Sequence, residues 1–298
     1  MHMYMRAIGF SEMVTKAQER QLLQKMEEAP YHGGDQKQEH AYTYAEKRCQ
    51  VGDGFGVILH GYQQVEDHEF VREFYYPYME GNSITQMEAG YVRRHTDKES
   101  YAVLCEEYNM GSALIFYLTN GLEYQERQDE GKNVKIDSFS LTGLSVYGKI
   151  LLPVYKTEKQ IAKINANLEN RSRMLEAAKS GDPAAMESLS LDDMNTYGQI
   201  SRRMVKEDIY SIVDTCFMPT GVECDNYMVI GEILSYELVE NSWTGEKIYR
   251  MVISCNGIDI TIGINQKDLM GEPQVGRRFK GDIWLQGIGH FDERAAEI

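Results

Sequence analysis

Four isoleucines that alternate with other residues near the carboxyl end constrain the fold of this chain more than any other feature. They occupy every second position from Ile258 to Ile264, and the residues between them are Asp259, Thr261 and Gly263. Successive side chains of a β-strand point to opposite faces, so this period of two predicts a strand with one buried apolar face. Such a strand requires neighbouring strands and an apolar core.

The residues around this strand predict a small all-β region over residues 226–298. Short apolar or alternating runs recur at regular spacing, and we expect strands at 228–238, 246–254, 258–264 and 279–286. A short DLMG connection precedes the last of them. Three strands, a short connection and a closing strand are typical of a small β-barrel of the oligonucleotide/oligosaccharide-binding (OB) type, and an SH3-like barrel is the alternative.

The first 156 residues predict a mainly antiparallel sheet with a packed helix. Charged and apolar residues from Ser11 to Glu28 indicate the helix, and Gly52, Asp53 and Gly54 indicate the turn of a hairpin. The strands expected in this region are 41–50, 55–64, 70–79, 101–108, 113–118 and a pair within 135–155. Strands that cluster in sequence, with no regular alternation of helices, are typical of the α+β class.

Residues 157–225 are expected to form a helical middle segment that links or covers the two β-rich regions. Thr157 and Gln160 have the spacing of a capping box, and the helix that they begin should run to about Lys179. A later apolar run from Ile209 to Phe217 fits a helix or a strand, and we predict a helix. We therefore expect three regions, with boundaries at 156 and 225.

Charge and cysteine content narrow the possible functions. The 298-residue chain has a formal net charge of -15, and all three regions are acidic, which argues against binding to nucleic acid or to an anionic membrane. No run of about 18 apolar residues predicts a membrane span. Five scattered cysteines indicate reduced thiols, so we expect a cytoplasmic location. No cofactor or metal motif occurs, and the oligomeric state is not specified.

A turn around Pro219 and Gly221 carries the strongest candidates for catalysis. Two cysteines and three carboxylates bracket it, namely Asp214, Cys216, Glu223, Cys224 and Asp225. The enzyme hypothesis gives a carboxylate the role of general base, or Cys224 the role of nucleophile. The seven residues between the cysteines match no short zinc spacing, and no histidine lies nearby, so we expect no metal site. Buried thiols and loop-capping acids are the structural alternative.

Two tryptophans in the last region are candidates for ligand contact. Trp243 falls at the tip of the expected hairpin NSWTG, and Trp284 lies in the last strand beside Lys280. In a single-stranded nucleic-acid site, Trp284 would stack on bases while Arg277, Arg278 and Lys280 contact the backbone. The acidic chain argues against this hypothesis, and cover by the helical middle segment is the structural alternative for Trp284.

Several stretches also resemble a known family. They are YMRAIGF, FYYPY, ALIFYLTN, SLTGLSVYGKILLPV, SRRMVKEDIYSIVDTCFMPTGVECDNY and GEI. Together they are similar to a family of uncharacterised cytoplasmic proteins from clostridial-type bacteria, a domain of unknown function. The resemblance covers nearly the whole chain. It implies an intracellular bacterial protein and assigns no activity, cofactor or site residue.

The leading hypothesis from the sequence is a non-catalytic binding or scaffolding protein. Its titratable residues are scattered, and no base, nucleophile and anion-stabilising group can be placed together. In this hypothesis the sheet region and the small barrel share a surface for an unidentified protein or small-molecule partner. The step from such folds to partner binding rests on analogy between folds.

Overall fold

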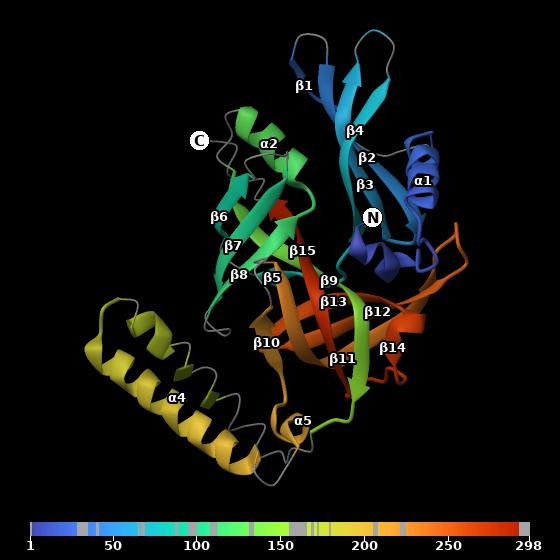
Figure 1. Ribbon diagram of the computed structural model, residues 1–298. Coiled ribbons are helices and arrows are strands. Elements are labelled where there is room, and N and C mark those ends of the chain that lie inside the picture. The colour runs from blue at the N-terminus through green and yellow to red at the C-terminus, as the bar shows by residue number, and fades with distance from the viewer. Residues whose placement is uncertain are drawn as a thin grey trace.

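Two β-sheets and a small number of helices make up the part of the chain that the computed structural model describes (Figure 1). The described residues are 2–291, except 29–34, 40–41, 65, 67–68, 87–88, 95–99, 108–111, 131–133, 155–165, 168–169, 172, 179, 205–207 and 221–224. Strands predominate and the helices are interspersed among them, so the expected α+β class is confirmed.

The smaller sheet contains four antiparallel strands in chain order: β1 (Asp35–Glu39), β2 (Tyr42–Gly52), β3 (Phe55–Gln64) and β4 (Phe70–Met79). The predicted hairpin is confirmed, because Gly52 pairs with Phe55 across the turn. Gly54 in that turn has a φ of 69°, a backbone conformation that glycine adopts readily.

The larger sheet contains eleven strands, and nine of them form a continuous order. In that order they are β10 (Cys216–Pro219), β11 (Asn226–Glu240), β12 (Lys247–Cys255), β13 (Ile258–Asn265), β9 (Ile136–Leu151), β15 (Arg278–Phe291), β8 (Ser112–Leu118), β7 (Tyr101–Glu107) and β6 (Ala89–Arg94). The two-residue strands β5 (Thr85–Gln86) and β14 (Leu269–Met270) both pair with β9.

Five strands of the larger sheet close into a ring. β11 pairs with β12 on one side and with β15 on the other, and β13 and β9 complete the circuit. All of these pairings are antiparallel except β13–β9. The four alternating isoleucines of β13 are at most 1 % exposed, so the predicted buried face is confirmed. The ring takes β9 from residues 136–151, far from its other four strands in sequence.

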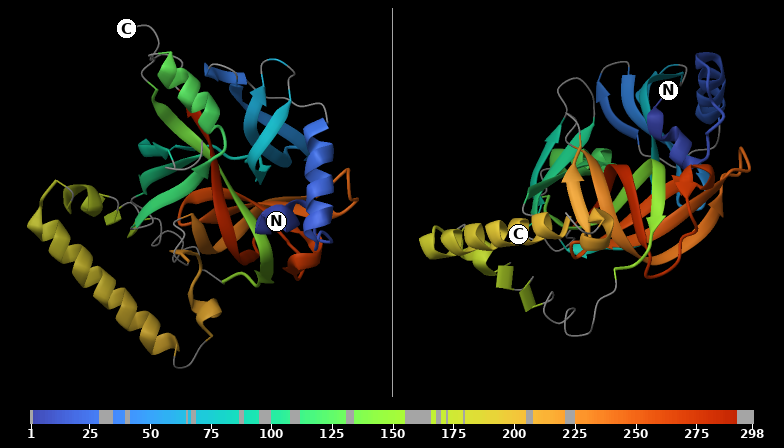
Figure 2. Two further views of the ribbon diagram at one scale, coloured as in Figure 1. Left: turned by 45° about the horizontal axis from the view of Figure 1, so that its top comes forward. Right: turned by 60° about the horizontal axis from the view of Figure 1, so that its bottom comes forward.

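The helices pack around the sheets or lie beside them. They are the 3-10 helix η1 (Met3–Ile8), α1 (Lys16–Glu28), α2 (Gly121–Asp129), α4 (Pro183–Met204), α5 (Ile209–Ile212) and the 3-10 turn η3 (Gln266–Asp268). α1 confirms the predicted first helix, and it begins in a capping box in which the Gln18 backbone N–H donates to Oγ1 of Thr15. Figures 1 and 2 show α4 to one side of the sheets.

The helix expected over Ile209–Phe217 is only partly present. Its first four residues form α5, but Cys216–Pro219 form β10, which pairs antiparallel with β11. The prediction is wrong for Phe217, because pairing with a neighbouring strand overrides the local helical spacing. Most of the stretch from Thr157 to Lys179 lies outside the described residues, so the helix expected there stays a prediction.

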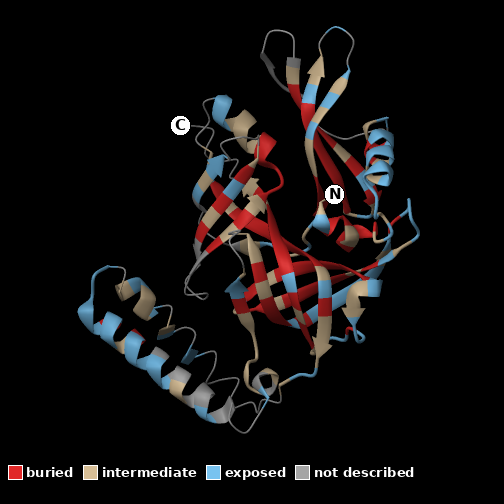
Figure 3. Cartoon of the chain, viewed as in Figure 1, coloured by how far each residue is buried: buried red, intermediate tan, exposed pale blue. Residues whose placement is uncertain are grey.

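The two sheets meet in a shared apolar core. One buried cluster fills the ring, while a second joins η1, α1 and the smaller sheet to ring residues such as Leu144, Ile248 and Trp284. Figure 3 shows this buried material running through both sheets. The amide of Gln286 on β15 also donates to the carbonyl of Pro77 on β4, at 2.7 Å. One face of β2, β3 and β4 is thus fixed against the larger sheet.

Candidate functional site

A row of polar and aromatic side chains lies on the face of the smaller sheet that meets the larger one. Tyr44, Glu46 and Arg48 occupy alternate positions of β2 and therefore share one face. His60 of β3 lies directly opposite Glu46 in the antiparallel register. The guanidinium of Arg48 reaches the larger sheet, where its Nη2 donates to the carbonyl of Thr119 at 2.9 Å.

Glu46 and Arg48 form an ion pair in a mostly water-excluded position. Nε of Arg48 donates to Oε1 of Glu46 at 2.6 Å, and the Glu46 side chain is only 6 % exposed. Burial raises the pKa of Glu46, and the charge and hydrogen bond of Arg48 offset part of this rise. The other carboxylate oxygen, Oε2, lies 3.6 Å from Nε2 of His60, which is beyond hydrogen-bond length.

His60 is a neutral histidine at the centre of this row. Its Nδ1 and Nε2 lie 3.2 Å from the hydroxyls of Tyr44 and Tyr76, and its ring stacks on Phe74 with centroids 4.6 Å apart. Burial and, to a smaller extent, the positive charge of Arg48 together lower the pKa of His60 to about 3. A neutral imidazole donates with one nitrogen and accepts with the other, so two hydroxyl partners satisfy it.

An aromatic cluster continues from His60 into the contact between the sheets. Tyr76 and Tyr117 share a hydrogen bond, and burial raises the pKa of both phenols. Trp284 packs edge-on against Tyr76, with centroids 6.2 Å apart, and Tyr4 of η1 stacks on it at 5.7 Å. These contacts fix the relative position of the smaller sheet and the ring.

A cavity of about 310 Å³ opens beside the Glu46–Arg48 pair. β2, α2 with its preceding turn, and β15 supply the lining residues Glu46, Arg48, Asn120, Leu122, Glu123, Glu126 and Ile288. Figures 1 and 2 show α2 and the smaller sheet at the same end of the molecule. Asn120 fastens α2 to β15, because its amide donates to the carbonyl of Gly289 and accepts from that residue's N–H, both at 2.9 Å.

Three carboxylates therefore surround this inter-sheet cavity. Glu123 accepts from Arg127 at 3.0 Å and from the amide of Asn120 at 3.1 Å. Burial raises the pKa of Glu126, and the negative charges of Glu123, Glu130 and Glu46 raise it further. The wall of the cavity is thus rich in hydrogen-bond acceptors and carries excess negative charge.

A larger cavity, of about 590 Å³, lies between the amino-terminal segment and the β11–β12 hairpin. Its most buried charge, Glu246, has both oxygens occupied. Oε1 accepts from Ser11 Oγ and Lys267 Nζ, and Oε2 accepts from the Ser11 N–H and Asn265 Nδ2. This arrangement fastens the amino-terminal segment to the turn before β12, and both oxygens of the Glu246 carboxylate are already occupied.

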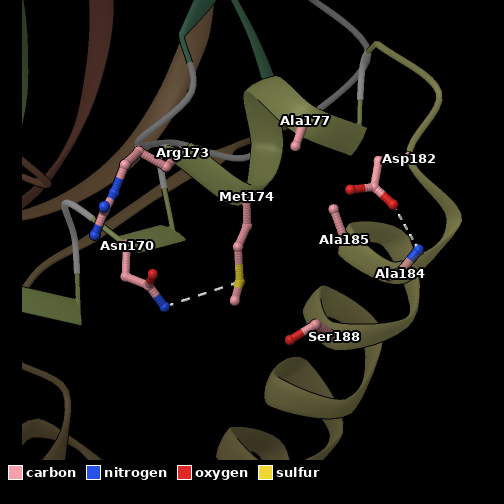
Figure 4. A pocket seen from close by; sticks show the side chains of 8 residues that line it. All are labelled: Asn170, Arg173, Met174, Ala177, Asp182, Ala184, Ala185 and Ser188. Carbon is pink, nitrogen blue, oxygen red and sulfur yellow. Dashed lines mark hydrogen bonds between the residues drawn. The ribbon is translucent and has the colours of Figure 1, made fainter.

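A third cavity, of about 350 Å³, lies between α4 and the helical residues 170–171 and 173–178 (Figure 4). Four of the eight lining residues are apolar, namely Met174, Ala177, Ala184 and Ala185. The side chain of Asp182 accepts from the N–H of Ala184 at 2.9 Å. Neither this cavity nor the larger one contains a buried ion pair like Glu46–Arg48. Within the described part of the chain, no three His, Cys, Asp or Glu side chains could together hold a metal ion.

The catalytic candidates around Pro219 have separate structural surroundings. Cys216 is half-buried, and its carbonyl accepts from Sγ of Cys255 at 3.1 Å. Burial raises the pKa of Cys216, which disfavours a reactive thiolate. Asp225 accepts from the indole N–H of Trp284 at 2.7 Å, and the backbone carbonyl of Asp214 accepts from Arg278 at 3.4 Å. Glu223 and Cys224 lie outside the described residues.

The two tryptophans occupy different environments. Trp243 is 39 % exposed in the turn between β11 and β12, whereas Trp284 is 6 % exposed. The rings around Trp284 belong to His2, Tyr4, Tyr76 and Tyr117. Arg277 donates to the carbonyl of Glu272 at 3.1 Å, and Lys280 donates to the hydroxyl of Tyr210. The candidate ligand residues thus do not converge on one described pocket.

The Glu46–Arg48 pair and His60 were not predicted as site residues. The sequence does contain a signal for the pair, because Glu46 and Arg48 have opposite charges and occupy alternate positions of a predicted strand. Charges on one strand face ordinarily indicate solvent, however. Only the position of the second sheet shows that this face is covered.

Fold and site together define a class: an α+β protein with a closed five-strand ring, a second sheet and a charged cavity lined by β2, α2 and β15. No helix in the described part of the chain is long and apolar enough to cross a membrane. The chain belongs to a family described as a domain of unknown function with an E. rectale gene description (DUF3881), whose model matches residues 5–287. No curated protein and no solved structure matches it.

Proposed function

We propose that this protein binds a small molecule in the inter-sheet cavity and does so without catalysing a reaction. The observation that carries the proposal is the buried Glu46–Arg48 pair in the wall of a cavity of about 310 Å³. Ligand pockets in proteins typically begin at this size and combine apolar lining with a few fixed polar groups. Leu122 and Ile288 supply apolar surface beside the charged pair.

The fixed geometry of the pair supports this proposal. Arg48 is held by Glu46 and by the carbonyl of Thr119, so a ligand would meet charges that are already oriented. A preorganised site loses less conformational entropy when a ligand binds. A buried ion pair adds little stability by itself, because desolvation offsets much of its Coulombic attraction. A role in recognition would account for the presence of the pair.

The proposal also includes three expectations from the sequence, which concern the small barrel, the helical middle segment and the cytoplasmic location. The five-strand ring would be the small OB-like or SH3-like barrel. It would hold β15, one of its own strands, in a fixed position beside the cavity. The helical middle segment would link the regions before residue 157 and after residue 225. A cytoplasmic location agrees with the free thiols of Cys49, Cys105, Cys216 and Cys255.

A thermal-shift screen of a metabolite library against the wild type and Ile288→Phe tests the proposal. The larger side chain should fill the cavity and abolish the response to a true ligand. Ile84→Phe is the matched control, because Ile84 is 63 % exposed and does not line this cavity. A ligand at 100 times its Kd stabilises the protein by roughly 2.7 kcal/mol, which moves Tm by several degrees.

We expect at least one compound to shift the Tm of the wild type and of Ile84→Phe but not that of Ile288→Phe. The proposal fails if every compound that shifts the wild type shifts folded Ile288→Phe equally. It also fails if no compound in a library covering cations, anions, sugars and nucleotides shifts the wild type.

A further inference from the structure

The charges around the inter-sheet cavity do not balance. Its lining contains three carboxylates, from Glu46, Glu123 and Glu126, and one guanidinium, from Arg48. Arg127 lies outside the lining and pairs with Glu123. Even with Arg127 counted, carboxylates outnumber guanidinium groups by three to two. Because Arg48 pairs with Glu46 and Arg127 pairs with Glu123, the surplus negative charge lies on Glu126.

Two acceptor positions in this wall remain open. Glu46 is nine-tenths buried, and Arg48 occupies only its Oε1, while Oε2 has no hydrogen-bonding partner closer than the 3.6 Å contact with His60. Within the described residues, no hydrogen bond or ion pair reaches the carboxylate of Glu126. Glu46 Oε2 is not among the buried side-chain atoms that lack a partner, and Glu126 is half-exposed, so both carboxylates can be reached from the cavity that they line. Both groups would gain from a ligand that brings N–H donors and positive charge.

We propose that the cavity binds a small organic cation through a primary ammonium or guanidinium group, anchored by Glu46 and Glu126. The proposal rests on the proposed binding function and names the chemical class of its ligand. An anion would meet the surplus negative charge. A bare metal ion is a poorer fit, because the described chain offers no set of three close ligands and the cavity has room for an organic molecule.

The raised pKa of Glu46 and that of Glu126 agree with this assignment. Burial contributes most to both shifts, and neighbouring glutamates raise both further. A bound cation would reverse the effect of the neighbouring charges and lower both pKa values. Binding should therefore release protons at any pH at which these carboxyl groups are partly protonated in the free protein.

Isothermal titration calorimetry with three four-carbon compounds tests the ligand class. Agmatine carries an ammonium and a guanidinium group, 1,4-butanediol is neutral, and succinate is an anion. We expect saturable one-to-one binding of agmatine and no measurable binding of the other two. Glu126→Gln should weaken agmatine binding about tenfold or more, because a hydrogen bond to a charged group is replaced by a neutral one.

Glu46→Gln should weaken binding by at least as much, since Glu46 is the more buried anchor. Its fold is checked by circular dichroism, because the variant leaves Arg48 without its anionic partner. Glu126 is on the rim and half-exposed, so Glu126→Gln keeps the test decisive even if Glu46→Gln unfolds. Glu187→Gln is the matched control, an exposed glutamate on α4 outside the cavity lining. It should bind agmatine like the wild type.

The outcomes separate this proposal from the one on which it rests. Equal binding of agmatine by Glu126→Gln and Glu187→Gln would show attraction to the acidic surface in general and would overturn the cation site. Agmatine that binds no better than 1,4-butanediol would overturn it too. If another compound then loses its binding in Ile288→Phe, the cavity still binds ligands and only the cation assignment fails. If Ile288→Phe affects no ligand, both proposals fail.

Discussion

His60 should make the folded protein sensitive to acid between pH 6.5 and 3. Unfolded chains take up a proton on histidine near the ordinary pKa of 6.5, whereas burial keeps folded His60 neutral down to about pH 3. Between these values the unfolded state binds more protons, so stability falls as the pH falls. At 1.36 kcal/mol per pKa unit, the loss is about 3 kcal/mol at pH 4.5 and about 4 kcal/mol at pH 3, where folded His60 is itself half protonated.

That loss is a large part of the roughly 5–15 kcal/mol that holds a typical domain folded. The assay is urea unfolding at several pH values between 4 and 7, carried out on the wild type and on His60→Gln. The amide of glutamine keeps one donor and one acceptor for Tyr44 and Tyr76 but takes up no proton. Other groups titrate in both proteins, including Glu46, so the difference between the two curves isolates His60.

We expect the free energy of unfolding of the wild type to fall more steeply with acid than that of His60→Gln. Near pH 5 the difference in slope should be about 1.4 kcal/mol per pH unit, which corresponds to one extra proton bound by the unfolded state. Parallel curves would refute the reasoning. An NMR titration provides a direct check, because the ring signals of His60 should stay at their neutral position while the pH passes through 6.5. A midpoint near 6.5 for His60 would show that it is not held neutral by burial.

Two further predictions concern stability. Arg278→Lys should lower the free energy of unfolding by about 2–3 kcal/mol, since the forked guanidinium donates to the carbonyls of Leu152, Tyr210 and Val213 and an ammonium cannot match this geometry; an unchanged urea midpoint would contradict it. Glu246→Gln should cost about 1–3 kcal/mol at pH 7 and progressively less as the pH falls from 4.5 to 2. Burial tends to raise the pKa of Glu246, yet its hydrogen bonds outweigh burial and lower the pKa, so its contribution exists above the ordinary pKa of about 4.5 and is lost on acidification. Equal losses at pH 7 and pH 2 would exclude this account.

Local patterns in the sequence were enough to predict many of the elements. The turn at Gly54 requires a positive φ that glycine provides, and the isoleucines from Ile258 to Ile264 need a single buried face. Both features depend on residues close together in the chain. The α+β class followed from the same local signals.

Long-range pairing could not be predicted in the same way. Nothing within β9 indicates that Thr142 lies beside Thr261 in a parallel register, because that pairing depends on the whole ring. The strand at Phe217 depends equally on β11, its partner. The inter-sheet cavity was missed for the same reason, since Glu46 and Arg48 look like solvent-facing charges until a second sheet covers them.

The ring also sets the order in which the molecule can assemble during synthesis. β9 leaves the ribosome long before β13 and β15, the two strands between which it finally lies. One edge of β9 lacks β13 and the other lacks β15 until each of these strands is made, and exposed strand edges favour association with other chains. Closing the ring then joins segments more than a hundred residues apart, and contacts of such separation form slowly. We therefore expect refolding to be slow and its yield to fall as protein concentration rises.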